Sequence, residues 1–190
     1  MSASSTFCCA VRLAAKTESG AVREYDIRPA VPDDAAALYR FGEILLGESD
    51  FFLRSPGERA RSADEMRTVI KRLHELPAHC LLCAWQEGAP VGEAVMIGGD
   101  FKRDRYSATV GVGVLAAHSR QGIGRALMRD IESFARNRKL RRLELTVMAH
   151  KARARALYEQ MGYLQEGVKR DSLFVDGVFV DEIMMAKLLH

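Results

Sequence analysis

A glycine-rich turn between a predicted strand and a predicted helix restricts the fold of this 190-residue chain most strongly. The run SATVGVGVLAA at residues 107–117 predicts a strand, and the turn HSRQGIG behind it contains Gly122 and Gly124. Apolar residues then recur at the spacing of one helix face: Leu127, Ile131 and Phe134. A strand, a short turn and a helix in this order form a building unit of α/β proteins.

The rest of the chain mixes hairpins with helices. Further strands are predicted at residues 23–30, 79–85, 91–99 and 141–149 and in two runs between 163 and 189, and further helices at 33–47, 62–76 and 151–162. The order β-α-α-β-β-β-α-β-α-β-β combines strands joined by tight turns with strands joined by helices. We therefore expect a single α/β domain with a mixed sheet flanked by helices.

Two local patterns sharpen this assignment. Ser62 and Glu65 form the S-x-x-E pattern of a capping box, which predicts the start of the second helix. Gly111 and Gly113 lie inside the predicted strand at 107–117, where glycine often marks a bulge or the close approach of a ligand.

The composition is that of an ordinary soluble domain, with 48% hydrophobic and 28% charged residues. The formal net charge is only +3, which argues against a nucleic-acid-binding protein. Arginines gather between Arg120 and Arg155. They are consistent with solvated helix faces or with attraction of a small polyanionic ligand.

Four cysteines bear on compartment and metal binding. Cys8 and Cys9 fall in a predicted extension, whereas Cys80 and Cys83 lie in the apolar run HCLLCAW. A zinc site needs four ligands and a redox pair usually opens a helix, so we expect buried free thiols, no metal and a cytoplasmic setting. No apolar stretch is long enough to span a membrane.

The N-terminus has a different character from the rest of the chain. Residues 1–22 are rich in Ser and Ala, lack the apolar segment of a signal peptide and predict a flexible extension, with targeting as an alternative. The folded domain is expected over residues 23–190.

The predicted helix start suits an anion. The first amide groups of a helix have no partner within the helix, and the helix dipole favours negative charge there. Gly122 and Gly124 lack the side chains that would keep a pyrophosphate away, and Arg120 and Arg125 can add charge. A tight turn without a ligand explains the two glycines equally well. The Walker pattern is absent, and the third glycine position of the dinucleotide fingerprint holds Leu127.

The wider context resembles the Gcn5-related N-acetyltransferase (GNAT) family. The resemblance rests on the strand before QGIG, on Gly122 and Gly124, and on a second block, KARARALYEQMGY. The matching residues of that block are Ala154, Leu157, Tyr158, Gly162 and Tyr163. It extends through the C-terminus and, more weakly, back to about Arg23.

This resemblance implies a mostly antiparallel GNAT-like sheet and acetyl-coenzyme A (acetyl-CoA) as the acetyl donor. The pyrophosphate would lie on the amides of residues 119–125, and the pantetheine arm along 112–115, in an opening beside the strand at 141–149. The expected donor-binding residues are Val112, Val114, Leu115, Ser119, Arg120, Gln121, Gly122, Ile123, Gly124 and Arg125.

The chain departs from the family pattern at two positions. Ser119 replaces the usual Arg or Gln before the first glycine, and Lys151 replaces the usual Asn of the second block. Backbone amides provide most of the phosphate contacts, so we expect donor binding to persist. The family's Asn usually helps to order the chain near the pantetheine, and Lys151 lacks its amide group.

The resemblance also assigns catalytic roles. It implies that Tyr158 is the acid for the leaving thiolate, and a backbone amide near Val114 is expected to stabilise the oxyanion. Glu93 is the favoured base, and other candidates, or a water chain, remain open. These other candidates are Glu144, His118 and His150.

The acceptor is the least constrained feature. Residues 47–59 predict a lid in which Glu48 and Asp50 can bind a cationic amine. We expect acetylation of a primary amine of a small molecule such as an amino acid or polyamine. Alternatives are acetylation of a protein N-terminus or ribosomal protein, and a non-catalytic acyl-CoA-binding module. The family resemblance further suggests a homodimer.

Overall fold

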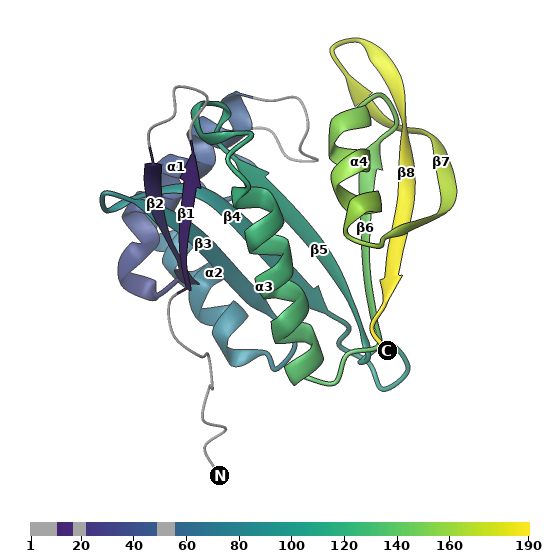
Figure 1. Ribbon diagram of the computed structural model, residues 1–190, viewed down its shortest axis with the longest axis horizontal. Coiled ribbons are helices and arrows are strands. Elements are labelled where there is room, and N and C mark those ends of the chain that lie inside the picture. The colour runs from purple at the N-terminus through teal and green to yellow at the C-terminus, as the bar shows by residue number, and fades with distance from the viewer. Residues whose placement is uncertain (1–10, 17–21, 49–55) are drawn as a thin grey trace.

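One eight-stranded sheet organises the protein. The computed structural model describes residues 11–16, 22–48 and 56–190. The strands are β1 (Val11–Lys16), β2 (Val22–Pro29), β3 (Cys80–Gln86), β4 (Ala89–Gly98), β5 (Ser107–Val114), β6 (Arg142–Met148), β7 (Leu164–Val175) and β8 (Val178–Leu188). They are arranged in the order β1-β2-β3-β4-β5-β6-β8-β7, and β5 and β6 are the parallel neighbours in this otherwise antiparallel sheet (Figure 1).

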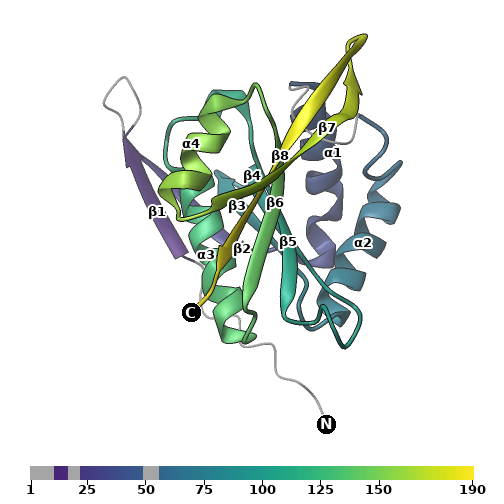
Figure 2. The ribbon, with the colours of Figure 1, turned by 90° about the vertical axis from the view of Figure 1, so that its right-hand side faces the viewer.

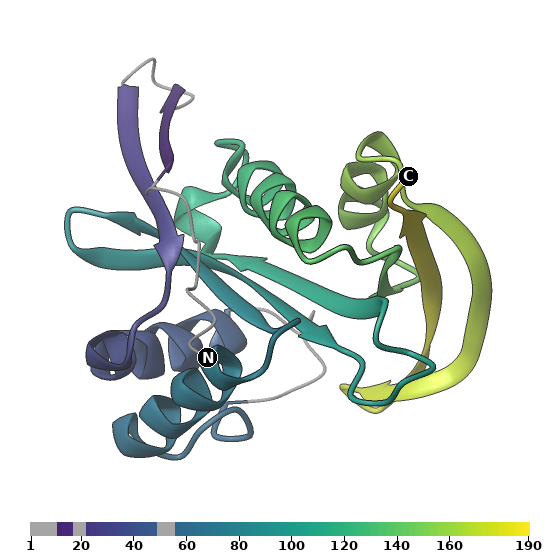
Figure 3. The same ribbon diagram turned by 90° about the horizontal axis from the view of Figure 1, so that it is seen from below.

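Two pairs of helices cover the two faces of the sheet. The helices are α1 (Ala35–Gly47), α2 (Ala63–Glu75), α3 (Ile123–Asn137) and α4 (Ala152–Gln160). Figures 2 and 3 place α1 and α2 on one side of the sheet, with α3 and α4 on the other. Each side has its own core: Leu127 and Ile131 of α3 pack in one, and Leu38 of α1 and Ile70 of α2 pack in the other. The predicted α/β fold with a mostly antiparallel sheet is therefore confirmed.

The sheet begins one strand earlier than the predicted order. β1 lies within residues 1–22, the segment assigned to an N-terminal extension, and pairs antiparallel with β2 from Val11–Ile27 to Lys16–Val22. The sequence of β1, VRLAAK, alternates weakly, and its strand character depends on the pairing with β2. Within the described residues, no helix is both long and apolar enough to cross a membrane.

The two cysteines of HCLLCAW are buried free thiols, as predicted. Cys80 packs in the core under α3, and Cys83 packs in the core under α1 and α2. They lie in one strand but join cores on opposite faces of the sheet, so they cannot act as a pair. Burial raises the pKa of the Cys80 thiol to about 12.

The N-terminus of α2 confirms Ser62 as a helix cap. The backbone N–H of Glu65 donates to the Ser62 hydroxyl at 3.2 Å. The Glu65 carboxylate accepts from the backbone N–H of Arg61 at 2.8 Å, one residue before the position that a capping box would use. This hydrogen bond lowers the pKa of Glu65.

We expect Ser62→Ala to lower the free energy of unfolding by about 1 kcal/mol, because it leaves an amide of the first helical turn without its acceptor. Ser62→Asp should retain most of the stability, since aspartate also caps helices well. Urea unfolding followed by circular dichroism measures both. Equal stability of Ser62→Ala and wild type would contradict a stabilising cap.

Candidate functional site

The site forms where β5 and β6 separate. These strands pair at only three positions, Ser107–Arg142, Ala108–Leu143 and Thr109–Glu144, although β5 stays paired with β4 as far as Val114 (Figure 1). Beyond Thr109, the β6-facing edge of β5 pairs with no described strand. The expected opening beside the strand at 141–149 is therefore present as an interior sheet edge.

The direction of the backbone amides along this edge can be assigned. The N–H of Leu115 donates to the Val91 carbonyl at 3.0 Å, so it points towards β4. Amides alternate in direction along an extended strand, so those of Val112 and Val114 point towards the unpaired edge. An extended ligand can pair with them as an added strand would.

The N-terminus of α3 lies at one end of this edge. Gly122 is the N-cap residue and has φ +78°, a left-handed conformation that other residues adopt only with strain. A Cβ atom at Gly122 would meet nothing within 4 Å, so the backbone conformation, and not crowding, requires glycine there. The amides of Ile123, Gly124 and Arg125 form the first turn and have no acceptor within the helix.

Three predicted segments converge beside Gly124. A Cβ atom placed on this glycine would lie 3.8 Å from both Leu157 of α4 and Val114 of β5. The contact places the second sequence block, which contains Tyr158, next to the glycine turn and the strand edge. Lys151 is the N-cap residue of α4, so the helix forms with lysine in place of the family's usual asparagine.

Several side chains expected to contact phosphate already have protein partners. The Ser119 hydroxyl donates to the Ala116 carbonyl at 2.8 Å. The guanidinium of Arg125 donates to the Gln160 side chain. Arg120 has φ +63° in the turn itself. The first-turn amides are therefore a better-placed anion site than the side chains of Ser119 and Arg125.

Tyr25 is a residue of the site that the sequence did not reveal. It is fully buried in β2, and its hydroxyl donates to the Gln121 side chain and lies 3.4 Å from Nδ1 of His118. This contact ties the glycine turn to a strand almost 100 residues earlier. Burial, together with the charge of Arg23, lowers the pKa of His118, which favours a neutral ring at neutral pH.

Glu48, predicted to bind a cationic acceptor, has another role in the structure. Its carboxylate accepts from the backbone N–H of Ala116 at 2.8 Å, immediately after β5. It thereby fixes the chain between the strand edge and the glycine turn to the end of α1. Asp50 and residues 49–55 of the predicted lid lie outside the described residues.

Tyr158 and Glu93 lie on opposite faces of the sheet. Tyr158 is buried on the α3 and α4 side, 6.0 Å between ring centroids from Tyr163, and burial raises the pKa of Tyr158 to about 12. Glu93 is on the α1 and α2 side, opposite Gly113 of β5, and its carboxylate accepts from Arg59 at 2.6 Å. The two groups therefore flank β5 without touching each other.

The other candidate bases are less well placed. Glu144 lies near the last β5–β6 pair and forms an ion pair with Arg142 at 2.9 Å. His150 is exposed in the turn after β6. In the described ranges, no group of three or more His, Cys, Asp or Glu side chains is arranged to hold a metal ion.

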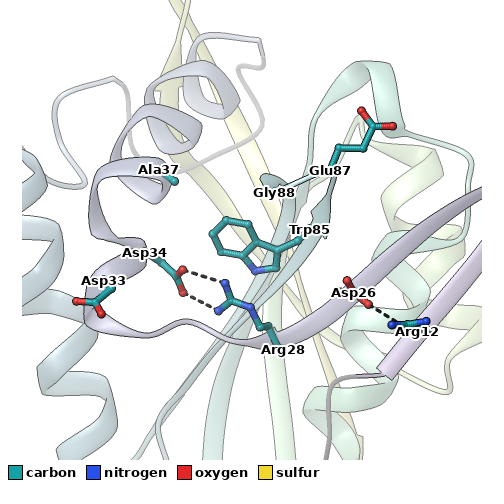
Figure 4. A pocket seen from close by; sticks show the side chains of 9 residues that line it. All are labelled: Arg12, Asp26, Arg28, Asp33, Asp34, Ala37, Trp85, Glu87 and Gly88. Atoms are coloured by element: carbon teal, nitrogen blue, oxygen red, sulfur yellow. Dashed lines mark hydrogen bonds and ion pairs between the residues drawn. The ribbon is translucent and has the colours of Figure 1, made fainter.

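A separate pocket of about 620 Å³ lies at the other end of the sheet, on β1, β2, β3 and α1 (Figure 4). Four of its charged groups form two ion pairs: Arg12 with Asp26 at 3.5 Å, and Arg28 with Asp34 at 2.7 Å. Arg28 also stacks 4.3 Å from the centre of the Trp85 ring. The pocket shares no residue with the β5–β6 edge, so it is not the site described above.

Comparison with known proteins agrees with this geometry. A family model described as "Acetyltransferase (GNAT) family" matches residues 48–163, more than half of the chain. No curated protein sequence matches the chain significantly.

Several solved structures are similar over almost the whole described chain. A GNAT-family acetyltransferase from Streptococcus pneumoniae has a TM-score of 0.83 at 25% identity, over 87% of this chain and 99% of that one. Ribosomal-protein-alanine N-acetyltransferase from Brucella melitensis has a TM-score of 0.76 at 24% identity, over 86% and 99%. A GNAT-superfamily phosphinothricin acetyltransferase from Sinorhizobium meliloti, in complex with acetyl-CoA, has a TM-score of 0.73 at 17% identity, over 87% and 88%.

We expect Gly122→Ala to weaken the binding of acetyl-CoA, because alanine strains the left-handed N-cap that aims the α3 amides. Gly177→Ala is a matched control, since Gly177 has φ +82° and open space around it but lies in the β7–β8 turn. Both substitutions should cost about 1–2 kcal/mol in unfolding free energy. Only Gly122→Ala should raise the dissociation constant measured by calorimetry. Equal affinities of the two variants would contradict the assignment of the anion site.

Proposed function

Because the chain belongs to the GNAT acetyltransferase family and is an acetyl-CoA-dependent N-acetyltransferase, we propose that it acetylates a primary amine of a small molecule by direct attack on the donor. The observation that carries the proposal is the unpaired edge of β5, which ends beside the α3 N-terminus. In this proposal, acetyl transfer takes place where the β5 edge meets the N-terminus of α3. The proposed catalytic residues lie within residues 23–190, and β1 adds Val11–Lys16 to the sheet of the same domain.

The donor is proposed to bind through backbone groups. The amides of Val112 and Val114 face the free edge and suit the amide-rich pantetheine arm. The amides at the start of α3 suit the pyrophosphate, and the left-handed Gly122 leaves open space beside them. When bound, acetyl-CoA supplies an electrophilic thioester. The Val114 amide is the proposed donor to the oxygen that becomes negative during the reaction.

Tyr158 is the proposed acid. Its raised pKa, about 12, keeps the phenol protonated at neutral pH, so it has a proton to give to the leaving sulfur. An acid of this kind loses activity as the pH rises through its pKa, so Tyr158 imposes no loss below about pH 11. Its neighbour Leu157 contacts the same small region as Gly124 and Val114, which supports this placement.

Glu93 is the proposed base, acting directly or through water. Its carboxylate lies across β5 from Tyr158, opposite Gly113, so the amine and the donor would approach the strand edge from different faces. A neutral amine is needed for attack, and a carboxylate on the acceptor face can accept the proton that the amine loses.

A panel of amines tests the function and identifies the acceptor class. The wild-type protein is incubated with acetyl-CoA and amino acids, polyamines, aminoglycosides and peptides with free N-termini, and mass spectrometry follows acetylated products. Two of the similar structures named above are described as acetyltransferases of ribosomal-protein alanine and of phosphinothricin, so the panel includes both peptide and small-molecule acceptors. Products from peptides alone would contradict a small-molecule acceptor. Tight donor binding without any product would favour a non-catalytic module.

We expect Tyr158→Phe to lower kcat by about 10²-fold or more, with donor affinity nearly unchanged, because only the leaving-group proton is lost. Tyr163→Phe is the matched control, since Tyr163 is a buried neighbour that also loses one hydroxyl. It should change stability but leave kcat within a few-fold of wild type. A Tyr158→Phe enzyme with normal kcat would contradict the assignment of the acid.

A cytoplasmic homodimer is the proposed physiological form. The free, buried thiols of Cys80 and Cys83 support a reducing compartment. The β7–β8 hairpin supports association with a second copy: β6 pairs with β8 only from Glu182 to Leu188, so the tip beyond lacks a third strand. The tip exposes large apolar side chains: Phe174, Val178 and Phe179. An isolated hairpin with exposed aromatics gains stability by packing on another surface.

Sedimentation equilibrium should give twice the 21.1 kDa mass of the chain. Phe179→Ser should shift the protein towards monomer by removing apolar contact area. Phe101→Ser, at another exposed phenylalanine in the β4–β5 connection, should leave the dimer intact. A wild-type monomer at high concentration would contradict the proposal.

A further inference from the structure

We propose that Arg59 is a positioning residue for the acceptor side of the reaction: it holds one carboxylate oxygen of Glu93 and leaves the other directed to the incoming amine. This inference rests on the proposed function, in which Glu93 is the base. Arg59 lies within the α1–α2 connection and belongs to neither sequence block of the family resemblance.

The contact between the two groups is short and nearly buried. Nη2 of Arg59 donates to Oε2 of Glu93 at 2.6 Å, and the two side chains are only 13% and 15% exposed. None of the described residues forms a hydrogen bond with the second oxygen, Oε1. A carboxylate held through one oxygen can still accept a proton at the other.

Gly42 provides the space that Arg59 occupies. It lies in the middle of α1, where glycine is unfavourable, yet a Cβ atom there would lie 2.9 Å from Nη1 of Arg59 and 3.3 Å from its Cδ. The arginine therefore packs directly on the backbone of α1. Nη1 is buried and has no hydrogen-bond partner in the described structure, so Glu93 is the anion that compensates this guanidinium.

The other groups around Glu93 do not compete for Arg59. β3 contributes Cys83, the cross-strand neighbour of Glu93, and burial raises the pKa of that thiol well above its ordinary value, so it stays neutral. β5 contributes Gly113, which has no side chain. Arg28 and Asp34 act on Cys83 from β2 and the turn before α1, but they form a pair with each other. Arg59 is thus the cation that pairs with Glu93.

An ion pair of this kind can also serve stability alone, and the two roles differ in their pH dependence. Without Arg59, a carboxylate that is 85% buried favours its protonated form, which cannot accept a proton. The acid limb of the kcat/KM profile would then move to higher pH. A residue that only stabilises the fold would lower the melting temperature and leave the profile of the folded enzyme in place.

The experiment compares pH profiles of kcat/KM for wild type, Arg59→Gln, Arg59→Lys, Gly42→Ala and Arg61→Gln. We expect Arg59→Gln to move the acid limb up by at least one pH unit, about a tenfold loss on that limb. Arg59→Lys should recover part of the shift because the charge is kept. Gly42→Ala should produce a partial shift, because the added methyl group displaces the guanidinium while alanine favours the helix. Arg61→Gln, which removes an exposed arginine paired with Glu65, should match wild type.

A second measurement does not require turnover. In protein labelled with ¹³C at glutamate carboxylates, the Glu93 resonance is assigned by its loss in Glu93→Gln and followed from pH 4 to 9. We expect Glu93 to stay ionised to lower pH in wild type than in Arg59→Gln or Gly42→Ala. If Arg59→Gln fails to fold, Arg59→Lys and Gly42→Ala carry the comparison.

The outcomes separate this inference from the proposed function. Absence of any acetylated product from wild type contradicts the function before a variant is compared. Turnover by wild type, with superimposable profiles and Glu93 titrations for wild type, Arg59→Gln and Gly42→Ala, overturns the role of Arg59 and leaves the function intact. Shifts in both the kcat/KM profile and the Glu93 titration, confined to the Arg59 and Gly42 variants, establish the positioning role of Arg59.

Discussion

The separation of β5 from β6 after three residue pairs is the constraint on which the rest of the site depends. β5 remains paired with β4, and β6 remains paired with β8, so the outward-facing backbone groups of both strands have hydrogen-bond partners. The helices α3 and α4 lie over one face of the opening between the two inner edges. An interior edge of this kind exposes amides with which an extended ligand can pair. The same divergence brings Val114, Gly124 and Leu157 together at its end.

The two groups that flank β5 lie in different environments. On the α4 side, Tyr158 has no charged partner that lowers its pKa, so desolvation keeps it neutral and able to donate. On the α1 side, Glu93 forms a nearly buried ion pair with Arg59. Separate environments on the two faces of the sheet allow an acid and a base to act at the same site without neutralising each other. The sheet itself keeps them apart.

Local patterns were sufficient to predict much of the fold. The periodicity of α3, the Ser62 cap and the apolar character of β3 each depend on residues close in sequence, and all three are observed. β1 was not predicted, because VRLAAK becomes a strand through pairing with β2. The glycine turn was recognised because a left-handed Gly122 is a local backbone requirement.

The partners of the site residues could not be predicted in this way. Tyr25 reaches Gln121 across 96 positions, and Glu48 reaches the Ala116 amide across 68, so no spacing rule connects them. Arg59 is one of several arginines near a loop until the structure places it over Gly42. Sequence reasoning therefore identified groups with the right chemistry, such as Glu93 and Ser119, but could not determine which of their atoms were already engaged.

These long-range contacts also explain how the chain can depart from the family pattern at Ser119. Its hydroxyl donates to the Ala116 carbonyl, so it orders the turn instead of extending towards a ligand. Glu48 holds the Ala116 amide from α1, and Tyr25 holds Gln121 from β2. The turn is thus fixed from outside the motif, and its amides keep their direction without a charged side chain at position 119. An anion site made of backbone amides tolerates replacement of a neighbouring side chain as long as the backbone stays in place.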